Sequence, residues 1–462
     1  MQHLSLSTRR IPVNLLGFKD LSIVRNNILP RQRQNTNTHA PNFRFIAQTR
    51  RFSESPIKTL FNQSEKSEIQ RICADMLKSS NVLENSFSNL HNRSVLLIQG
   101  PDSDVFLQGL TTNQMQRLSN EPGMYLNFLY SNGRVMADAF IYKNKSLSGS
   151  SEKSYLIEID SSMKDTLLLL FKIHKLRSKI DFLDVSDSYS VWSIWGAHLS
   201  SPNHPTMIEQ IINENYSSSE ALCFPDTRAP NLGMRMVMKN SSIKKPMLPS
   251  EFIEKDMSEY TLLRTIMGVP EGPKDLIPKV SLPLELNLDL MNGVDFEKGC
   301  YVGQELTIRT HHRGVVRKRV IPVLLSSDNI YAANSSSQKK SSSLGSVDKT
   351  INLSFSSQSE APIEYLIEGS EVSDPFANTL KDVKLARSRI PGKLHSSIYN
   401  VGLAVMRLDV AAKYQKLVFP VTDTTAGSAS DFSQQLSSPP LVVKDSNNQN
   451  VFLTPVFPYW WF

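Results

Sequence analysis

The chain has 462 residues, 40% of them hydrophobic and 21% charged, which predicts a globular protein with two or three domains. No run of about 18 apolar residues occurs, so the sequence predicts no membrane-spanning helix. The formal net charge is +7, but residues 1–53 hold nine basic side chains and one acid, so the remainder lies near −1 and gives little electrostatic support for nucleic-acid binding.

The basic N-terminal segment has the features of a mitochondrial presequence. It is rich in Arg, Ser and Asn and nearly free of acids, and Leu15, Phe18 and Leu21 share one face of a helix. Two arginines precede Phe52 at the expected processing junction. We therefore predict a presequence over residues 1–52 and residence in the mitochondrial matrix. The alternative is a disordered basic tail that binds acidic surfaces.

Helices and strands alternate between residues 54 and 196. The helical spacing of Ile69, Ile72 and Met76 predicts a helix within 54–80. The next predicted elements are a strand at 95–98, a short helix capped by Asp102 or Ser103, a hairpin over 124–142 that turns at Asn132-Gly133, a strand at 154–160, a helix at 163–176 and a strand at 188–196. Strand and helix units combined with hairpins indicate the α+β class.

The last third of the chain combines strand-like pieces with serine-rich tracts. The strand-like pieces are 315–325, 362–369, 401–410 and 416–421. The tracts near 326–361 and 422–440 have too few apolar residues to pack, and we predict that they are disordered insertions. Short strands broken by loops suggest a small C-terminal β-barrel.

The segment "FEKGCYVGQELTIRTHHRGVVRKR", residues 296–319, carries the most unusual chemistry. Gly299 and Gly303 flank Cys300 and permit backbone conformations closed to other residues, so the thiol is expected on a tight exposed bend. If 304–311 is a helix, Cys300 lies just before its N-terminus, where unpaired N–H groups and Lys298 favour the thiolate. The alternative is a buried turn cysteine that fills a small gap.

Two further pairs follow Cys300. Glu305 and Arg309 stand four residues apart and are expected to pair on the helix. His311 and His312 are adjacent rather than helically spaced, so they are not predicted to bind a metal. The chain has three cysteines and no C-x-x-C, which excludes a disulfide framework and a self-contained zinc or four-cysteine cluster site and fits a reducing compartment.

Residues 298–305, Lys-Gly-Cys-Tyr-Val-Gly-Gln-Glu, resemble the K-G-C-Y-x-G-Q-E signature of the YgfZ family. This family is related to the glycine-cleavage aminomethyltransferase (T protein). The resemblance extends over 282–319 and is strongest to the mitochondrial members, which assist iron–sulfur cluster assembly. Weaker matches, in family order, are "GPDSDVFLQGLTTN", "NGRVMADAFIY", "DTRAPNLGMRM" and "VGLAVMRLDV".

The resemblance implies intertwined folate-binding-type domains around a central opening, followed by a β-barrel. The aminomethyltransferase-like core is then expected over 53–313 and the barrel over 314–462. Tetrahydrofolate is the implied cofactor. Asp138 falls where the transferases carry a carboxylate facing the folate, with Asn132 as a second candidate. The alternative for Asp138 is a hairpin residue that is hydrogen-bonded to backbone.

The implied function is support of [4Fe–4S] protein maturation, with aconitase- and lipoate-synthase-type clients. A-type iron–sulfur carriers and client apoproteins are the implied partners, and no bound metal of the chain's own is predicted. Cys300 is the implied catalytic thiol or transient cluster ligand, with a partner supplying the other ligands. The signature-loop residues are Lys298, Gly299, Cys300, Tyr301, Gly303, Gln304, Glu305 and Arg309.

Two alternatives stay open, a folate-dependent aminomethyl or one-carbon transferase and a folate-dependent RNA-modification factor. In the transferases a Gly-Glu motif contacts the pterin near the position of "LGMRM", where Arg235 stands in this chain. The transferases also lack the cysteine loop. Both departures weaken the case for glycine-cleavage chemistry, and the sequence assigns no turnover of the chain's own.

Overall fold

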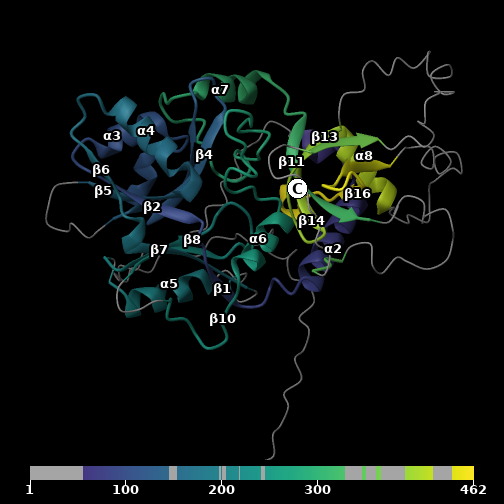
Figure 1. Cartoon of the computed structure of the whole chain (residues 1–462), viewed down its shortest axis with the longest axis horizontal. Helices are drawn as coiled ribbons and strands as arrows, with labels where there is room; N and C mark the ends of the chain where they lie inside the picture. Colours follow the sequence, from purple (N-terminus) through teal and green to yellow (C-terminus); the bar gives the residue numbers. More distant parts are fainter. Residues whose placement is uncertain are drawn as a thin grey trace, which may run out of the picture. The chain divides into compact units, whose positions relative to one another are not determined.

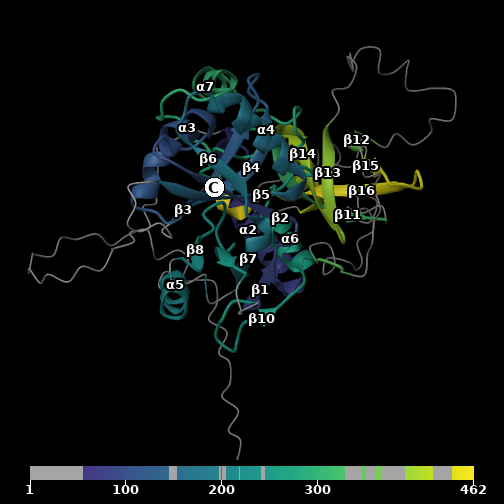
Figure 2. The ribbon, with the colours of Figure 1, turned by 60° about the vertical axis from the view of Figure 1, so that its left-hand side comes forward.

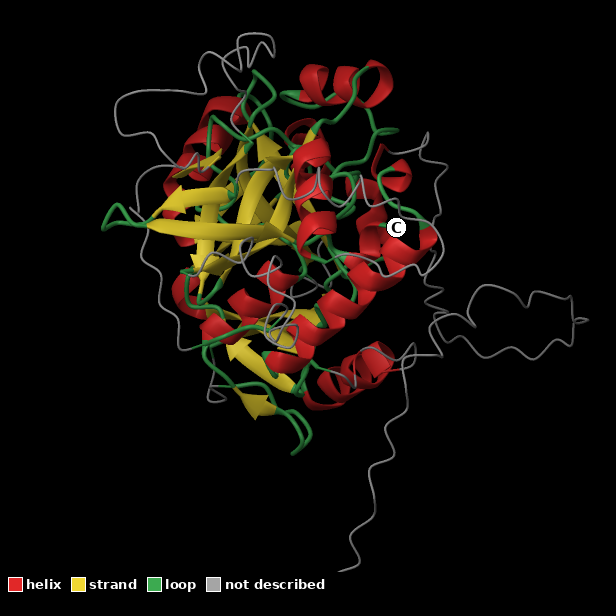
Figure 3. Cartoon of the chain, turned by 90° about the vertical axis from the view of Figure 1, so that its right-hand side faces the viewer, coloured by secondary structure: helices red, strands yellow, loops and turns green. Residues whose placement is uncertain are grey.

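The computed structural model contains two open five-stranded sheets and one closed barrel in the described part of the chain, with helices on either side of the strands (Figure 1, Figure 3). The predicted α+β class is confirmed. The described residues are 56–144, 153–196, 199, 204–217, 219–240, 245–327, 346–349, 361–365, 391–419 and 440–462. The predicted presequence lies outside them.

The first sheet has the strand order β3-β4-β5-β2-β6 and contains the predicted hairpin. Its strands are β2 (Arg93–Gln99), β3 (Gly123–Leu129), β4 (Val135–Lys143), β5 (Ser154–Asp160) and β6 (Asp181–Asp184). The side chains of β3 alternate between two cores. Leu126 and Phe128 pack with helices α3 (Ser103–Leu110) and α4 (Lys164–Lys175), whereas Tyr125 belongs to the core on the opposite face.

The second sheet has the order β10-β1-β7-β9-β8. Its strands are β1 (Ser86–Asn89), β7 (Tyr189–Trp195), β8 (Ala221–Pro225), β9 (Met234–Lys239) and β10 (Ile253–Glu254). One face packs Trp192 and Met236 with Ile208 and Ile212 of α5 (His204–Asn215). The other face contributes Trp195 to the large core shared with α6 (Met257–Ile266).

The predicted barrel is present and closes because β16 pairs with both β15 and β11 (Figure 2). Its strands are β11 (Lys318–Ser326), β12 (Ala361–Tyr365), β13 (Gly392–Ile398), β14 (Val401–Arg407), β15 (Leu441–Lys444) and β16 (Asn450–Pro455). Val323 and Leu403 of the barrel share one continuous core with Tyr125 and Trp195 of the sheets. The domain boundary at 313/314 therefore stays a prediction.

Two local predictions are wrong. The strand predicted over 416–421 is wrong for its first half, because residues 416–418 are the end of α8 (Leu408–Val418), which buries Leu408, Ala411, Gln415 and Val418 at helical spacing. Residues 420–421 lie outside the described residues. The turn at Asn132-Gly133 has a longer loop than the predicted two-residue turn. Tyr130 N–H donates to Arg134 O at 2.8 Å and Gly133 N–H donates to Tyr130 O at 2.9 Å, with Gly133 alone at positive φ (80°).

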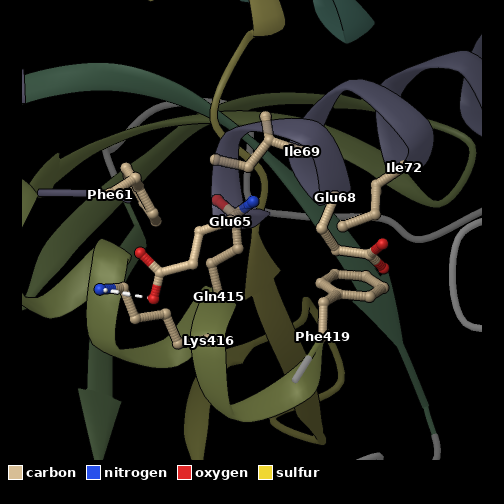
Figure 4. Close-up of a pocket in the computed structure, with 8 residues that line it drawn as sticks. All are labelled: Phe61, Glu65, Glu68, Ile69, Ile72, Gln415, Lys416 and Phe419. Atoms are coloured by element: carbon tan, nitrogen blue, oxygen red, sulfur yellow. Dashed lines mark ion pairs between the residues drawn. The ribbon is translucent and has the colours of Figure 1, made fainter. Parts of the chain in front are cut away.

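Helix α2 (Gln63–Ser79) follows the short α1 (Pro56–Thr59) and packs against the C-terminal residues. Its Asn62 and Glu65 form a capping box. Glu65 also pairs with Lys416 of α8 at 3.0 Å beside a narrow cleft lined by Phe61, Ile69 and Phe419 (Figure 4). On the buried side, Phe61 packs edge-on against Phe457 and Phe462, and the Cys73 thiol donates to Phe457 O.

The disorder predicted for the serine-rich tracts near 326–361 and 422–440 stays a prediction. Most of 326–361 lies outside the described residues, as does almost all of 422–440. Residues 346–349, however, dock on the core: Val347 is buried, and its N–H donates to Ser79 Oγ at 3.0 Å. Asp348 N–H donates to Asn400 Oδ1 at 2.8 Å, and Lys349 pairs with Glu259.

Deleting residues 334–345 should therefore leave the free energy of unfolding within about 1 kcal/mol of the parent value, because loop-closure entropy changes by only about 0.6 kcal/mol per doubling of length. Extending the deletion through residue 349 should lower stability further, since it removes buried Val347. Urea unfolding of both variants checks this. A large loss from the shorter deletion would show that the tract packs or binds.

None of the helices in the described residues combines the length and hydropathy needed to cross a lipid bilayer.

Candidate functional site

The signature loop leads directly into helix α7 (Gln304–Arg313), as predicted, and Gly314 ends that helix. Gly303 occupies the N-cap position with a left-handed φ of 79°. Tyr301 N–H donates to Gln304 Oε1 at 3.2 Å, which ties the loop to the first turn of the helix. Gly299 has no positive φ and nothing within 4 Å of a hypothetical Cβ, so only Gly303 requires glycine.

Cys300 is exposed, whereas Cys73 and Cys223 are buried. Burial raises the pKa of the Cys73 thiol to about 12 and also raises that of Cys223, which leaves both thiols protonated at neutral pH. Cys300 is thus the cysteine that a partner in solution can reach. The predicted exposed bend is confirmed, and the alternative of a buried gap-filling cysteine is excluded.

Lys298 anchors the loop through its ammonium group. Its ammonium donates to the carbonyls of Gln108, Thr111 and Asn113 at 2.8, 2.5 and 3.1 Å. It also lies 4.7 Å from the centre of the Tyr301 ring, a cation–π contact. Burial lowers the pKa of Lys298 to about 8. The lysine therefore fastens the cysteine loop to the C-terminal end of α3.

Two more contacts complete this attachment. Val302 N–H donates to Gly109 O at 3.0 Å, and Asp295 N–H donates to Thr112 O at 2.9 Å. The predicted Glu305–Arg309 ion pair does not form, and both side chains are exposed. At the other end of α7, His311 stacks on Phe296 with ring centres 3.7 Å apart.

The turn between β3 and β4 packs directly against the signature loop. A Cβ on Gly303 would lie 2.3 Å from Tyr130 O, and one on Gly133 would lie 3.0 Å from Gly303 O. The two glycines therefore allow turn and loop to approach backbone to backbone. Asn132 is exposed in this turn, where its Oδ1 accepts from Arg134 N–H at 3.1 Å, so the structure does not bring it together with Asp138.

Asp138 is buried in the middle of β4. Its carboxylate accepts from Gly272 N–H at 3.0 Å and pairs with Arg93 Nη1 at 3.2 Å. Burial raises its pKa, although Arg93 acts in the opposite direction. The alternative of a carboxylate hydrogen-bonded to backbone is thus correct for one oxygen, and the second oxygen belongs to a larger set of charges.

That set is a buried charge network between the two open sheets, and only Asp138 and Arg235 of it stand out from the sequence alone. Its members are Arg93, Asp138, Glu158, Asp226, Arg228, Arg235, Tyr260, Arg264, Glu271 and Asp275. The sequence does contain an indication of this network, because Glu158 and Arg235 are charged residues in the middle of the largely apolar strands "SYLIEID" and "MRMVMK".

The Glu271 carboxylate has three partners in this network. Its Oε2 lies 2.8 Å from Arg228 Nη1 and 3.0 Å from Arg235 Nη2, and it accepts from Tyr260 Oη at 2.7 Å. Burial alone would raise the pKa of Glu271, but the surrounding guanidinium groups, led by Arg235, hold it well below the usual range. Glu271 is therefore ionised at neutral pH.

Buried polar atoms that lack a well-aligned hydrogen bond lie next to the network. Asn127 stands directly opposite Asp138 in the β3–β4 ladder. Among the described residues, neither the Asn127 amide nor the Tyr125 hydroxyl forms a well-aligned hydrogen bond. Gly293 faces both side chains, since a Cβ there would lie 2.9 Å from the Tyr125 ring and 3.1 Å from Asn127 Nδ2. Such atoms indicate a place for a polar ligand.

Sequence comparison with curated proteins shows which family the chain belongs to. It is 36% identical to the iron-sulfur cluster assembly factor IBA57 homolog, mitochondrial, of Aspergillus fumigatus, over 72% of this chain and 73% of that protein. The Neurospora crassa and Mycosarcoma maydis proteins of the same name are 34% and 32% identical, covering 75% and 80% of the chain and 75% and 83% of their own lengths. The chain belongs to the mitochondrial IBA57 family of iron–sulfur cluster assembly factors.

The predicted membership of the mitochondrial iron–sulfur assembly branch is thereby confirmed. No protein-family model matches the chain. Among solved structures, the glycine cleavage system aminomethyltransferase T from Bartonella henselae matches with a TM-score of 0.51, over 83% of this chain and 89% of that one. The sequence identity is 10%, so this likeness shows that the IBA57 family member shares the aminomethyltransferase fold and shows nothing about its reaction.

Proposed function

We propose that this IBA57-family protein supports the maturation of [4Fe–4S] proteins in the mitochondrial matrix, and that Cys300 is its functional thiol. The observation that carries the proposal is the exposed Cys300 on a loop that Lys298 fastens to three backbone carbonyls. The cluster is cargo that passes through the site. One thiolate supplies one iron ligand, so a cluster bound here needs the remaining ligands from a partner.

A-type iron–sulfur carriers are the partners that we propose for this step, with aconitase- and lipoate-synthase-type apoproteins as clients. The names of the relatives support partners in the iron–sulfur machinery. The rigid attachment of the loop supports a role in presenting the thiol, because a ligand held in place loses less conformational entropy when a shared complex forms.

Cys300→Ser should fold normally and fail in function. The residue is exposed, so the free energy of unfolding should change by less than about 0.5 kcal/mol. In cells depleted of the protein, this variant should restore aconitase activity and protein lipoylation several-fold less well than the parent. Cys73→Ala/Cys223→Ala, which keeps Cys300 as the sole cysteine, is the control and should rescue. Full rescue by a stable Cys300→Ser variant would refute the role of the thiol.

We further propose that tetrahydrofolate binds beside Asp138, at the face of β3 and β4 that Tyr125 and Asn127 occupy. The Asn127 amide and Tyr125 hydroxyl fit a pteridine, because its ring edge offers both hydrogen-bond donors and acceptors. When bound, a folate supplies one-carbon chemistry, whereas this chain's residues orient the ring. Both side chains are buried, so binding requires the segment around Gly293 to move.

Calorimetric titration with tetrahydrofolate tests this site. Asn127→Leu should weaken binding about tenfold, since a lost hydrogen-bonding pair is worth about 1.5 kcal/mol. Its stability should stay the same or rise, because the buried amide has no well-aligned partner in the described residues. Asn132→Leu is the matched control in the exposed turn and should bind like the parent. Equal affinity of the parent, Asn127→Leu and Asn132→Leu for tetrahydrofolate would refute folate binding at this face.

A further inference from the structure

An open groove lies beside the signature loop, between α3 and the turn that ends α4. It has a volume of about 810 Å³. Its main lining residues are Val105, Phe106 and Leu110 of α3, Leu176 and Arg177 after α4, and Val302 of the signature loop. Two of the apolar side chains face solvent, since Val105 is 78% exposed and Leu176 is 87% exposed.

Leu176 is an unexpected residue for its position. It has φ 43° and ψ −110°, and Ser178 N–H donates to Lys175 O at 2.8 Å, so Leu176 is the first central residue of a type II′ turn. That position favours glycine, because a side chain strains the backbone there. The leucine side chain also contributes nothing to a core. A contact outside the chain explains both features.

The groove is continuous with the cysteine loop. Val302 lines it two residues after Cys300, and the Val302 N–H donates to Gly109 O of α3 at 3.0 Å. Lys298 binds the carbonyl of Gln108 in the same helix at 2.8 Å. A molecule seated in the groove therefore lies next to the loop that carries the exposed thiol.

The free charge at the rim of the groove is positive. Arg177 and Lys179 are exposed and form no ion pair within the described part of the chain. Of the nearby acids, Asp104 pairs with Lys153, whereas Asp102 keeps its charge and accepts from the Lys179 backbone N–H at 2.7 Å, so two cations stand beside one unpaired carboxylate. The groove thus combines an apolar floor with a cationic rim, which is complementary to an apolar segment flanked by carboxylates.

We propose that this groove docks an apolar, acid-flanked segment of the cluster-carrying partner and so aligns that partner with Cys300. The inference rests on the proposed function and adds the surface on which the partner is recognised. Apolar side chains of the segment cover Val105 and Leu176, and its carboxylates meet Arg177 and Lys179. Docking of this kind does not need the thiol.

The test measures binding of a purified A-type carrier, without its cluster, to the full chain. Leu176→Gly should weaken binding at least tenfold although it relieves backbone strain and does not lower the melting temperature. Val105→Asp and Arg177→Glu should weaken it similarly, and added salt should weaken the parent complex. Ile253→Asp, on an exposed apolar residue of β10, is the matched control and should bind normally. Cys300→Ser should also bind normally.

A photocrosslinker at position 105 identifies the occupant. The proposal expects crosslinks to a carrier peptide with apolar residues beside Asp or Glu. Crosslinks to a second copy or to another segment of this chain, no carrier binding by the parent, or full binding by Leu176→Gly would each overturn it. The proposed function has a separate readout, rescue of depleted cells. Rescue that needs Cys300 but tolerates Leu176→Gly would reject the groove alone.

Discussion

Glu271→Gln should lower the free energy of unfolding by about 3–5 kcal/mol, because removing one member of a buried ionic network leaves the others uncompensated. Arg228 and Arg235 both lie within 3.0 Å of Glu271 Oε2 and are buried, so neither can recover the lost interaction from water. Since the pKa of Glu271 is held below its usual range, its contribution is fully present at neutral pH and disappears as pH falls through that lowered pKa.

Urea unfolding at pH 7 measures the effect. The control is Asp409→Asn, which removes the surface pair between Arg407 and Asp409 and should lower the free energy of unfolding by less than about 1 kcal/mol. A loss from Glu271→Gln no larger than that of the control would mean that the network contributes little to stability. The complete burial of Arg235 would then require an explanation other than its pairing with Glu271.

Gly303→Val should be the most damaging single change in the signature loop. It places a β-branched side chain at φ 79°, and its Cβ would stand 2.3 Å from Tyr130 O and 2.9 Å from Leu129 Cβ. Backbone strain and displacement of the turn together should lower the free energy of unfolding by about 3 kcal/mol or more. Because the turn and the loop must separate, cluster-dependent activities should fall as well.

Gly299→Val is the matched control four residues earlier. No heavy atom lies within 4 Å of its hypothetical Cβ, and its φ is not positive. This variant should melt within a few degrees of the parent. Thermal unfolding and rescue of depleted cells compare the two variants. Equal melting temperatures would contradict the close approach between Gly303 and the hairpin turn.

Local patterns predicted the elements whose signals lie within a few residues. The hairpin of β3 and β4, helix α4 and helix α7 all have apolar periodicity bounded by turn residues, and each appears close to its predicted bounds. Helix α8 was missed because "KLVFPV" looks like a strand when read alone. Its helical period becomes visible only when Leu408, Ala411 and Gln415 are included.

The candidate site depends on contacts that sequence spacing does not encode. The exposure of Cys300 was predicted from its flanking glycines, but the partners of Lys298 were not, because Gln108 and Thr111 are nearly 190 residues away. The same holds for the network, where Arg93 meets Glu158 across β2 and β5. Isolated charges in apolar strands indicate burial with a partner, but they do not say which partner.

The packing of α2 on the end of the chain has a consequence for the order of folding. Phe61 and Cys73 complete their contacts only with Phe457 and Phe462, almost 400 residues later. Pairing of such distant segments requires a large loop closure before any burial is gained. The core around α2 therefore cannot be completed until the C-terminal residues have been synthesised, and the apolar face of α2 lacks these contacts until then.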